Sequence, residues 1–204
     1  MSKQYIITGI GTDVGKTVVS AIVSEALEAT YWKPVQAGDL DNSDSIKIGR
    51  LTKNVTVLPE AFRLTEPMSP HAAAEIDGVE ILPENLSLPE VNGNLIVEGA
   101  GGLMVPINSK GFLYADAFES WNLPTIIVSR HYLGSINHTL MTIEILKNRG
   151  VEIEGVVFVG GENPTTEEAI INTTGLRFIA RIPITNELNQ EFILEQAEKI
   201  KYVL

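Results

Sequence analysis

The sequence contains no cysteine and little positive charge, and both shortages narrow the classes of protein that it can represent. Because cysteine is missing, disulfides, thiolate metal sites and a cysteine nucleophile are excluded. The 204 residues carry 15 Lys and Arg against 26 Asp and Glu, which gives a net charge of −11. A nucleic-acid or anionic-membrane surface needs clustered basic residues, so we expect neither partner.

Long hydrophobic runs are also missing. The longest unbroken apolar run is the four residues Val156–Val159, whereas a membrane-spanning helix needs about 20. The chain enters a strand-like segment directly, without the apolar core of a signal peptide. With 44% hydrophobic residues it can still bury an ordinary core. We therefore expect a cytoplasmic protein that forms one domain over residues 1–204.

Short apolar segments alternate with longer segments of helical period. The apolar segments predict strands at 5–7, 31–35, 95–97, 125–128, 156–159 and 178–179. Apolar residues spaced about 3.6 apart predict helices over 16–29, 135–149 and 186–203. This alternation favours a doubly wound α/β fold, in which helices cover both faces of a mostly parallel sheet. Residues 59–92 hold five of the ten prolines and predict a surface excursion.

A glycine-rich loop, Gly9–Thr17, joins the first predicted strand to the first helix. Phosphate binding needs inward-facing N–H groups, glycines that permit this curvature and a helix N-terminus behind them. Lys16 would reach the terminal phosphates, and the Thr17 hydroxyl would bind Mg²⁺. Counting from Gly9, the spacing to the Gly-Lys-Thr end is one residue longer than in the strict motif. The loop predicts a P-loop NTPase-like fold and a nucleotide site with contacts from Asp13, Val14, Gly15, Lys16, Thr17 and Val18.

Three further charged residues stand at the ends of predicted elements. Lys33 ends the second strand, where open α/β sheets bind ligands, so we favour a functional role over an ordinary exposed lysine. Glu98 ends an apolar strand and precedes glycines, so its carboxylate can hold Mg²⁺ close to a phosphate. Asp44 opens a helix, and taken alone it is more simply an N-cap or a first-turn carboxylate.

The segment Gly134–Asn137 begins another predicted helix, whose free N–H groups suit a carboxylate. Capping by Ser135 alone is the simpler alternative, but it would assign no role to Asn137. No cysteine or close acidic cluster accompanies the three histidines, so we expect structural or capping roles for them and no metal ligation. These histidines are His71, His131 and His138.

Taken together, these segments resemble the dethiobiotin synthetase family. The matching stretches follow the family's order along the chain: 9–17, 32–38, 42–44, 69–71, 97–102 and 133–139. The resemblance implies a homodimer of one-domain subunits that uses ATP, Mg²⁺, CO₂ and 7,8-diaminononanoate. In the family's reaction, a substrate amine and CO₂ form a carbamate that attacks the γ-phosphate of ATP. The second amine then closes the ring of dethiobiotin and releases phosphate.

The resemblance also assigns residues to roles. Lys16 and Lys33 are the implied catalytic residues, and Thr17, Asp44 and Glu98 are the implied Mg²⁺ ligands. Beyond the phosphate loop, the implied nucleotide contacts are Asp44, Glu98, Gly99, Ala100, Gly101, Ile182, Pro183 and Ile184. The implied contacts to the diamine are Thr12, Lys33, Ala37, Gly134, Ser135 and Asn137, of which the last three would grip the substrate carboxylate across the dimer.

The sequence departs from the family's pattern at two places. Ala37 stands where the family often has Ser or Thr, and the fifth strand ends in Val159-Gly160 without the family's adenine-reading Asn.

Two alternative functions remain open. One alternative is a partitioning-type ATPase switch, which would carry a second lysine where this loop has Gly11. The other is a P-loop small-molecule phosphotransferase, against which the Gly134–Asn137 segment speaks.

Overall fold

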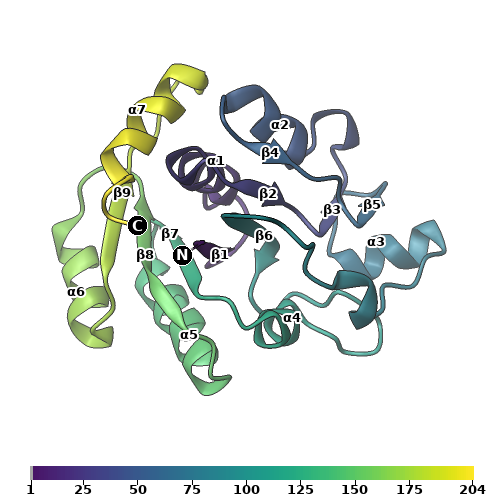
Figure 1. Cartoon of the computed structure of the whole chain (residues 1–204). Helices are drawn as coiled ribbons and strands as arrows, with labels where there is room; N and C mark the ends of the chain where they lie inside the picture. Colours follow the sequence, from purple (N-terminus) through teal and green to yellow (C-terminus); the bar gives the residue numbers. More distant parts are fainter. Residues whose placement is uncertain (1) are drawn as a thin grey trace.

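The computed structural model describes residues 2–204, and a seven-stranded parallel sheet runs through its centre (Figure 1). Every neighbouring pair in this sheet is parallel. The order across the sheet is β4 (Thr56–Val57), β2 (Thr30–Trp32), β6 (Leu95–Gly102), β1 (Gln4–Gly9), β7 (Thr125–Arg130), β8 (Ile153–Val159) and β9 (Phe178–Ile182). Because the strands are parallel, their carboxyl ends share one edge, where such sheets bind ligands.

Helices cover both faces of the sheet, as the doubly wound prediction requires (Figure 1). One face carries α1 (Lys16–Leu27), α2 (Asp44–Leu51) and α7 (Gln190–Ile200). The opposite face carries α4 (Tyr114–Trp121), α5 (Ser135–Asn148) and α6 (Pro164–Thr174). The predicted fold class is confirmed, and the three predicted helices are present with shorter ends.

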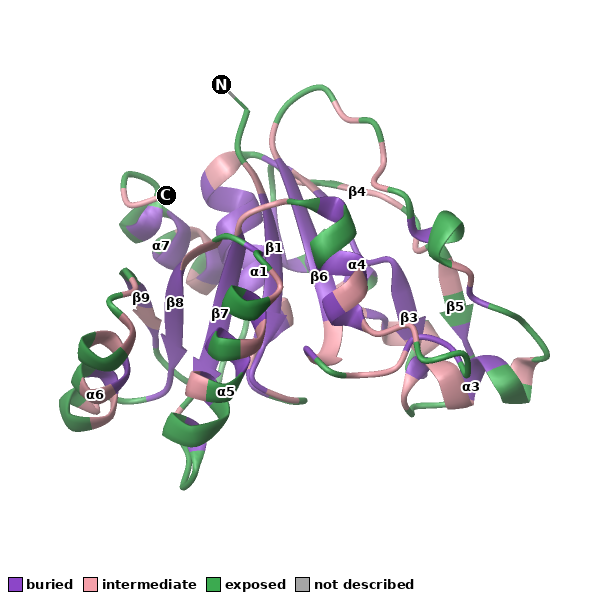
Figure 2. Ribbon diagram, turned by 90° about the horizontal axis from the view of Figure 1, so that it is seen from below, coloured by how far each residue is buried: buried purple, intermediate pink, exposed green. Residues whose placement is uncertain are grey.

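The core follows from the apolar strands. Their side chains are buried on both faces, and the outward sides of α5 and α6 are exposed (Figure 2). The buried apolar side chains form one continuous cluster that spans both layers of helices. Burying such side chains stabilises the fold by about 25 cal/mol per Å² of apolar area, which explains why uninterrupted apolar strands lie in the middle of the sheet.

The predicted strand at 31–35 is wrong in its second half. The sheet strand β2 stops at Trp32, and Val35–Ala37 form β3 in a separate two-stranded sheet with β5 (Phe62–Leu64). Pro34 lies between the two strands and has no N–H to donate to a ladder, so the strand cannot continue through it. This break leaves Lys33 directly after the carboxyl end of β2.

The prediction that 59–92 is only a surface excursion is also wrong. The segment contains β5, α3 (Pro70–Asp77) and the short helix η2 (Pro83–Leu86). Its apolar side chains join the main core through Leu64, Ala73, Ala74, Ile81 and Leu86. Prolines begin two of these elements rather than break them, because the fixed φ of proline suits the first turn of a helix.

None of the helices within residues 2–204 combines the length and the apolar composition that a membrane span requires.

Candidate functional site

A cavity of about 740 Å³ opens at the carboxyl edge of the sheet, within the range typical of small-molecule sites. Residues from segments far apart in the sequence line it together. Of the predicted nucleotide contacts, the lining includes Asp13, Gly15, Lys16, Thr17, Val18, Asp44, Glu98, Ala100, Gly101, Ile182, Pro183 and Ile184. Of the predicted substrate contacts, it includes Thr12, Lys33 and Ala37.

The phosphate loop curves through two residues with left-handed backbone. Asp13 has φ 56° and Gly15 has φ 98°, and Gly15 immediately precedes α1. Glycine adopts such a conformation without steric cost, which explains the glycine before Lys16. The Lys16 ammonium donates to the Gly11 carbonyl at 2.8 Å and folds back along its own loop. The loop thereby brings a cation and the N-terminus of a helix to the cavity.

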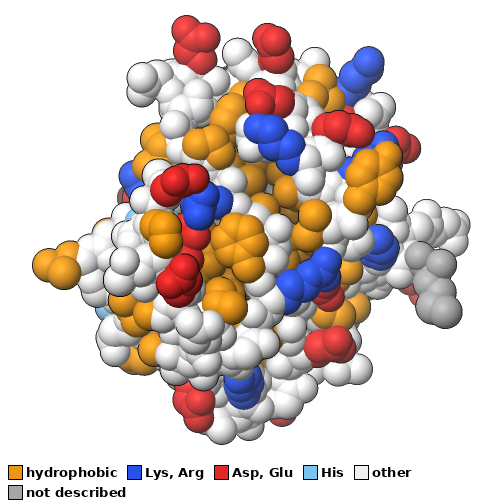
Figure 3. Space-filling model, turned by 90° about the vertical axis from the view of Figure 1, so that its left-hand side faces the viewer, with side chains coloured by type: hydrophobic (Ala, Val, Ile, Leu, Met, Phe, Trp, Pro, Cys, Tyr) orange, Lys and Arg blue, Asp and Glu red, His pale blue; other side chains and the backbone are white. Residues whose placement is uncertain are grey.

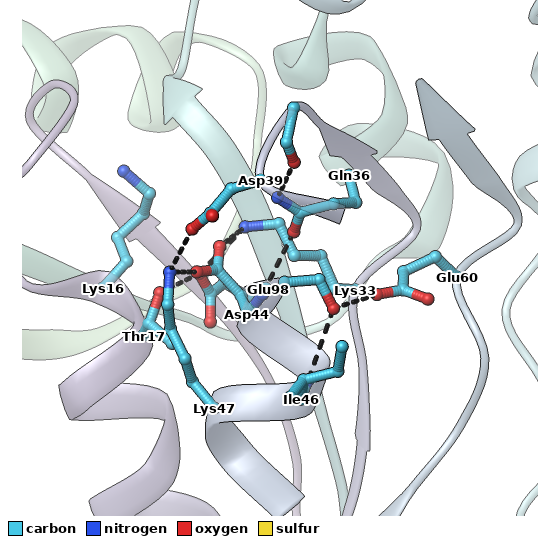
Figure 4. A network of polar contacts seen from close by, with 12 residues as sticks. Lys16, Thr17, Lys33, Gln36, Asp39, Asp44, Ile46, Lys47, Glu60 and Glu98 are labelled. Carbon is cyan, nitrogen blue, oxygen red and sulfur yellow. Dashed lines mark hydrogen bonds and ion pairs between the residues drawn. The ribbon is translucent and has the colours of Figure 1, made fainter. Parts of the chain in front are cut away.

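A second cluster of charge lies beside this loop (Figure 4). The Lys33 ammonium forms ion pairs with the Asp44 carboxylate and, at 3.2 Å, with Glu98 Oε1. The Thr17 hydroxyl donates to the same Glu98 oxygen at 3.0 Å. Lys47 extends the cluster from α2 and lies 3.5 Å from Asp44. Lys33, Asp44 and Glu98 therefore meet although 65 residues separate the first from the last.

The two lysines have opposite pKa shifts. Burial lowers the pKa of Lys16 to about 8, because the nearby carboxylates offset the loss of water only in part and the charge of Lys33 adds to the lowering. Burial also acts on Lys33, but the carboxylates of Glu98 and Asp44 more than offset it and raise its pKa above the ordinary value. Burial opposes the charge of Asp44 as well, yet Lys33 holds the pKa of Asp44 below its usual range.

Asp44 does not cap its helix. Ser43 is the N-cap residue of α2, and its hydroxyl accepts from the Ile46 N–H at 3.3 Å. Asp44 occupies the first turn, and its backbone N–H donates to Gln36 Oε1 at 3.2 Å. The first-turn position leaves its carboxylate free to turn toward Lys33, so the N-cap alternative is wrong.

The far end of the cavity is lined by apolar side chains from several elements. They belong to the ends of β8 and β9, to the loop after β9 and to α7: Val159, Ile182, Ile184, Leu188 and Phe192. Thr185 and Arg130 add polar groups to the lining of the cavity. Such a lining suits the flat, largely apolar faces of an aromatic base.

Two predicted nucleotide contacts do not line the cavity. Val14 is buried in the core. Gly99 lies against α4, where an added Cβ would come within 2.9 Å of Phe118. The glycine at 99 is thus explained by the close approach of Phe118 to β6.

The segment Gly134–Asn137 also lies outside this cavity. Gly134 is the N-cap residue of α5 with φ 102°, so Ser135 does not cap the helix and is instead its buried first residue. The Asn137 side chain is exposed and donates weakly to Met141 Sδ at 3.4 Å. Next to the segment, the Leu133 side chain is fully exposed. The structure does not bring these residues to the cavity of their own chain.

Two of the three histidines contact neighbouring side chains. His131 stacks on Phe158 with ring centroids 5.5 Å apart, and its Nε2 lies 2.9 Å from Glu167 Oε1. His138 Nδ1 lies 2.8 Å from the Tyr132 hydroxyl. No cluster of three or more His, Asp or Glu side chains suited to a metal occurs within the described part of the chain.

Several residues that line the cavity were not predicted from the sequence. Lys47 could have been found, since it follows Asp44 by three residues on one helix face. Arg130 ends β7 just as Lys33 follows β2, and its guanidinium donates to the Asp13 carbonyl at 2.9 Å. Phe192 of α7 and Leu188 of the loop before it carry no local signal, because only the packing of α7 against α1 brings this part of the chain to the site.

One face of the molecule shows how its charges are distributed. On the side of α6 and α7, acidic and basic side chains alternate with apolar ones and form no basic patch (Figure 3). A surface that binds a polyanion by its backbone phosphates would gather its cations in one place.

Comparisons with known proteins agree on the family. A family model described as an AAA domain matches residues 3–191. The ATP-dependent dethiobiotin synthetase BioD of Christiangramia forsetii is 53% identical over 203 residues, covering 98% of this chain and 97% of that protein. The protein of the same name from Rhodopseudomonas palustris (strain BisB5) is 47% identical and covers 94% and 91%.

Solved structures of lower identity share the fold. The cell division ATPase MinD of Pyrococcus furiosus superposes with a TM-score of 0.64 at 16% identity, with 100% of both chains covered. A ParA family ATPase from Chlorobium tepidum gives 0.59 at 14% identity, with 100% of this chain and 92% of that chain covered. At such identities the likeness shows the architecture alone.

Proposed function

The chain belongs to the family of ATP-dependent dethiobiotin synthetases, and we propose that the cavity at its sheet edge carries the reaction of that family. The protein is an ATP-dependent ligase of biotin biosynthesis, a dethiobiotin synthetase. Its substrates in this proposal are ATP, CO₂ and 7,8-diaminononanoate. One observation carries the assignment: two buried lysines from separate segments, Lys16 and Lys33, line the same cavity.

Lys16 and the phosphate loop bind the triphosphate. The transition state of phosphoryl transfer spreads charge over the transferred oxygens, so a cation placed beside them lowers the barrier. Lys16 reaches this position by exchanging the Gly11 carbonyl for phosphate oxygens. Asp13 and Gly15 hold the loop in the curved form that turns N–H groups toward an anion.

Lys33 acts at the other reacting centre. The first substrate amine and CO₂ form a carbamate, whose oxygen displaces ADP from the γ-phosphate. The second amine then attacks the carbamic–phosphoric anhydride, closes the ring and releases phosphate. Lys33 stabilises the negative charge that grows on carbamate and anhydride, because its ammonium is fixed in place before the reaction begins.

Thr17, Asp44 and Glu98 fit a magnesium ion. All three offer hard oxygen ligands, and the Thr17 hydroxyl oxygen lies 3.0 Å from Glu98 Oε1. The Lys33 ammonium already bonds both carboxylates, so the space beside them accommodates positive charge. When bound, Mg²⁺ would neutralise part of the charge on the β- and γ-phosphates.

The substrate carboxylate is held by a second subunit. Gly134, Ser135 and Asn137 match the family's carboxylate-binding segment but lie outside their own cavity. Exposed apolar side chains surround the segment, including Leu133 and Met141, and an isologous contact would cover them. We therefore infer a homodimer of one-domain subunits, working in the cytoplasm where ATP is available.

Coupled turnover tests this function. The purified protein should hydrolyse ATP only when both 7,8-diaminononanoate and bicarbonate are present, and mass spectrometry should detect dethiobiotin. Omitting either substrate is the internal control. ATP hydrolysis that ignores the diamine would instead support a switch ATPase, and a phosphorylated diamine without ring closure would support a phosphotransferase.

A further inference from the structure

Tyr31 lies beside the candidate metal ligands, and no step of the proposed reaction uses it. It is the middle residue of β2, pairs with Ile96 of β6 and is completely buried. Its hydroxyl donates to Glu98 Oε2 at 2.9 Å. Burying a hydroxyl costs free energy unless it is hydrogen-bonded, so the hydrogen bond to Glu98 offsets the cost of placing this hydroxyl in the site.

The two oxygens of the Glu98 carboxylate have different partners. Oε1 accepts from Thr17 at 3.0 Å and from Lys33 at 3.2 Å, whereas Oε2 accepts from Tyr31. Glu98 itself has no exposed surface. The last torsion of a glutamate side chain is soft on its own. The hydrogen bond from Tyr31 holds the second oxygen, so that together with Thr17 and Lys33 it fixes how the carboxylate plane is turned.

We propose that Tyr31 is a positioning residue that orients the Glu98 carboxylate so that Oε1 faces Thr17 and the cavity. The inference rests on the proposed function, in which Glu98 is a ligand of Mg²⁺. A partner that fixes a ligating carboxylate strengthens metal binding, and its loss typically weakens that binding by about 10–100-fold. Tyr31 thus contributes to metal affinity without touching the metal.

The chain offers a matched control in Tyr114, the first residue of α4. Its side chain is 1% exposed, and its hydroxyl is buried without a hydrogen-bond partner among residues 2–204. It lies within electrostatic reach of Lys33 and Glu98. Tyr31→Phe and Tyr114→Phe therefore each delete one buried hydroxyl near Glu98, but only the first breaks a hydrogen bond to it.

Manganese binding provides a readout other than activity, because Mn²⁺ favours the same oxygen ligands as Mg²⁺. Mn²⁺ is titrated into the full chain loaded with ADP, and free Mn²⁺ is followed by electron paramagnetic resonance. Glu98→Gln should weaken the affinity at least about ten-fold, and Tyr31→Phe about ten-fold. Tyr114→Phe should stay within about two-fold.

A double-mutant cycle separates positioning from a general structural effect. In the Glu98→Gln background, Tyr31→Phe should weaken Mn²⁺ binding little further, because the carboxylate that Tyr31 orients is already gone. A merely structural loss would appear equally in both backgrounds and would overturn the inference. Equal affinities of Tyr31→Phe and Tyr114→Phe would overturn it too, and would leave the metal assignment standing.

Failure of the proposed metal site is recognised separately. If Glu98→Gln leaves Mn²⁺ affinity unchanged, Glu98 is not a ligand, and both the metal assignment and the inference fall. Circular dichroism and melting of the ADP-loaded variants show whether they are folded. Should Tyr31→Phe not fold, 3-fluorotyrosine at position 31 keeps the ring and strengthens the donor. It should leave Mn²⁺ affinity within about two-fold of wild type, because the donor that orients Glu98 is kept, and an about ten-fold loss of affinity would overturn the inference.

Discussion

The phosphate loop and the end of β2 each bring a buried lysine to the cavity, in opposite electrostatic settings. Lys16 and Lys33 are similarly buried, at 8% and 5% exposure. The Lys16 ammonium bonds a backbone carbonyl, whereas Lys33 forms ion pairs with two carboxylates. The protein itself compensates the charge of Lys33. The charge of Lys16 is left for a polyanionic ligand to compensate.

The largest expected effect separates these two lysines. Lys33→Ala should keep ATP affinity but reduce turnover about 100-fold or more, because Lys33 faces charge that develops during the reaction. Lys16→Ala should weaken ATP binding and turnover together. Calorimetry with ATP and steady-state kinetics measure both quantities.

The exposed member of the same charge cluster is the control for this comparison. Lys47 also lies near Asp44 but is 28% exposed at its side chain. Lys47→Ala should therefore reduce turnover by less than about ten-fold, since water screens exposed charges. An equal loss of ATP affinity in the Lys16 and Lys33 variants would contradict the division between them.

A smaller effect is expected at the shared carboxylates. Asp44→Asn and Glu98→Gln keep side-chain volume but remove charge, so each should raise the Mg²⁺ concentration needed for half-maximal activity by about ten-fold. Titration of activity against Mg²⁺ at saturating ATP measures this. An unchanged titration for Asp44→Asn would assign Asp44 a structural role at the start of α2.

Mixing subunits tests the residues outside the cavity. Lys16→Ala and Asn137→Ala should each be nearly inactive as homodimers. After subunit exchange, half of the dimers are mixed, and each mixed dimer has one intact site. Activity should then recover to about a quarter of wild type. If mass spectrometry proves exchange but no activity returns, Asn137 serves its own subunit.

The smallest expected effect is the uptake of a proton by Lys16 when ATP binds. Because burial lowers the pKa of Lys16 to about 8, half of the free protein carries neutral Lys16 at that pH. Phosphates favour the charged form, so ATP binding at pH 8 should take up about half a proton, and affinity should fall as pH rises above 8. Lys33, with its raised pKa, stays charged and takes up none.

Calorimetry in buffers of different ionisation enthalpy measures this proton. Lys16→Arg is the control, because a guanidinium keeps its charge throughout this range. Without ligand, the depressed pKa also affects stability. Above pH 8 the unfolded chain holds more protons at Lys16 than the folded one, so this residue's contribution to stability rises up to its unfolded pKa. Equal proton uptake by wild type and Lys16→Arg would refute the assignment.

Local patterns predicted the strands, the phosphate loop and the two lysines because each depends on neighbouring residues. Uninterrupted apolar runs specify strands buried on both faces, and a glycine-rich loop between strand and helix specifies an anion site. The strand at 31–35 was wrong beyond Trp32 because Pro34 interrupts the ladder. The prediction for 59–92 was wrong because two of its prolines begin short helices instead of marking a loop.

The sequence by itself determined the family, the fold class and the residue types of the phosphate end, since these follow from motifs read along the chain. Only the tertiary structure decided that Thr17, Lys33 and Glu98 share one hydrogen-bonded cluster and that Tyr31 completes it. It also decided that Leu188 and Phe192 line the cavity, and that Gly134 and Asn137 do not line it. The physical reason is that contacts between distant segments depend on how parallel strands are ordered and how helices pack across them, and no local pattern encodes that order.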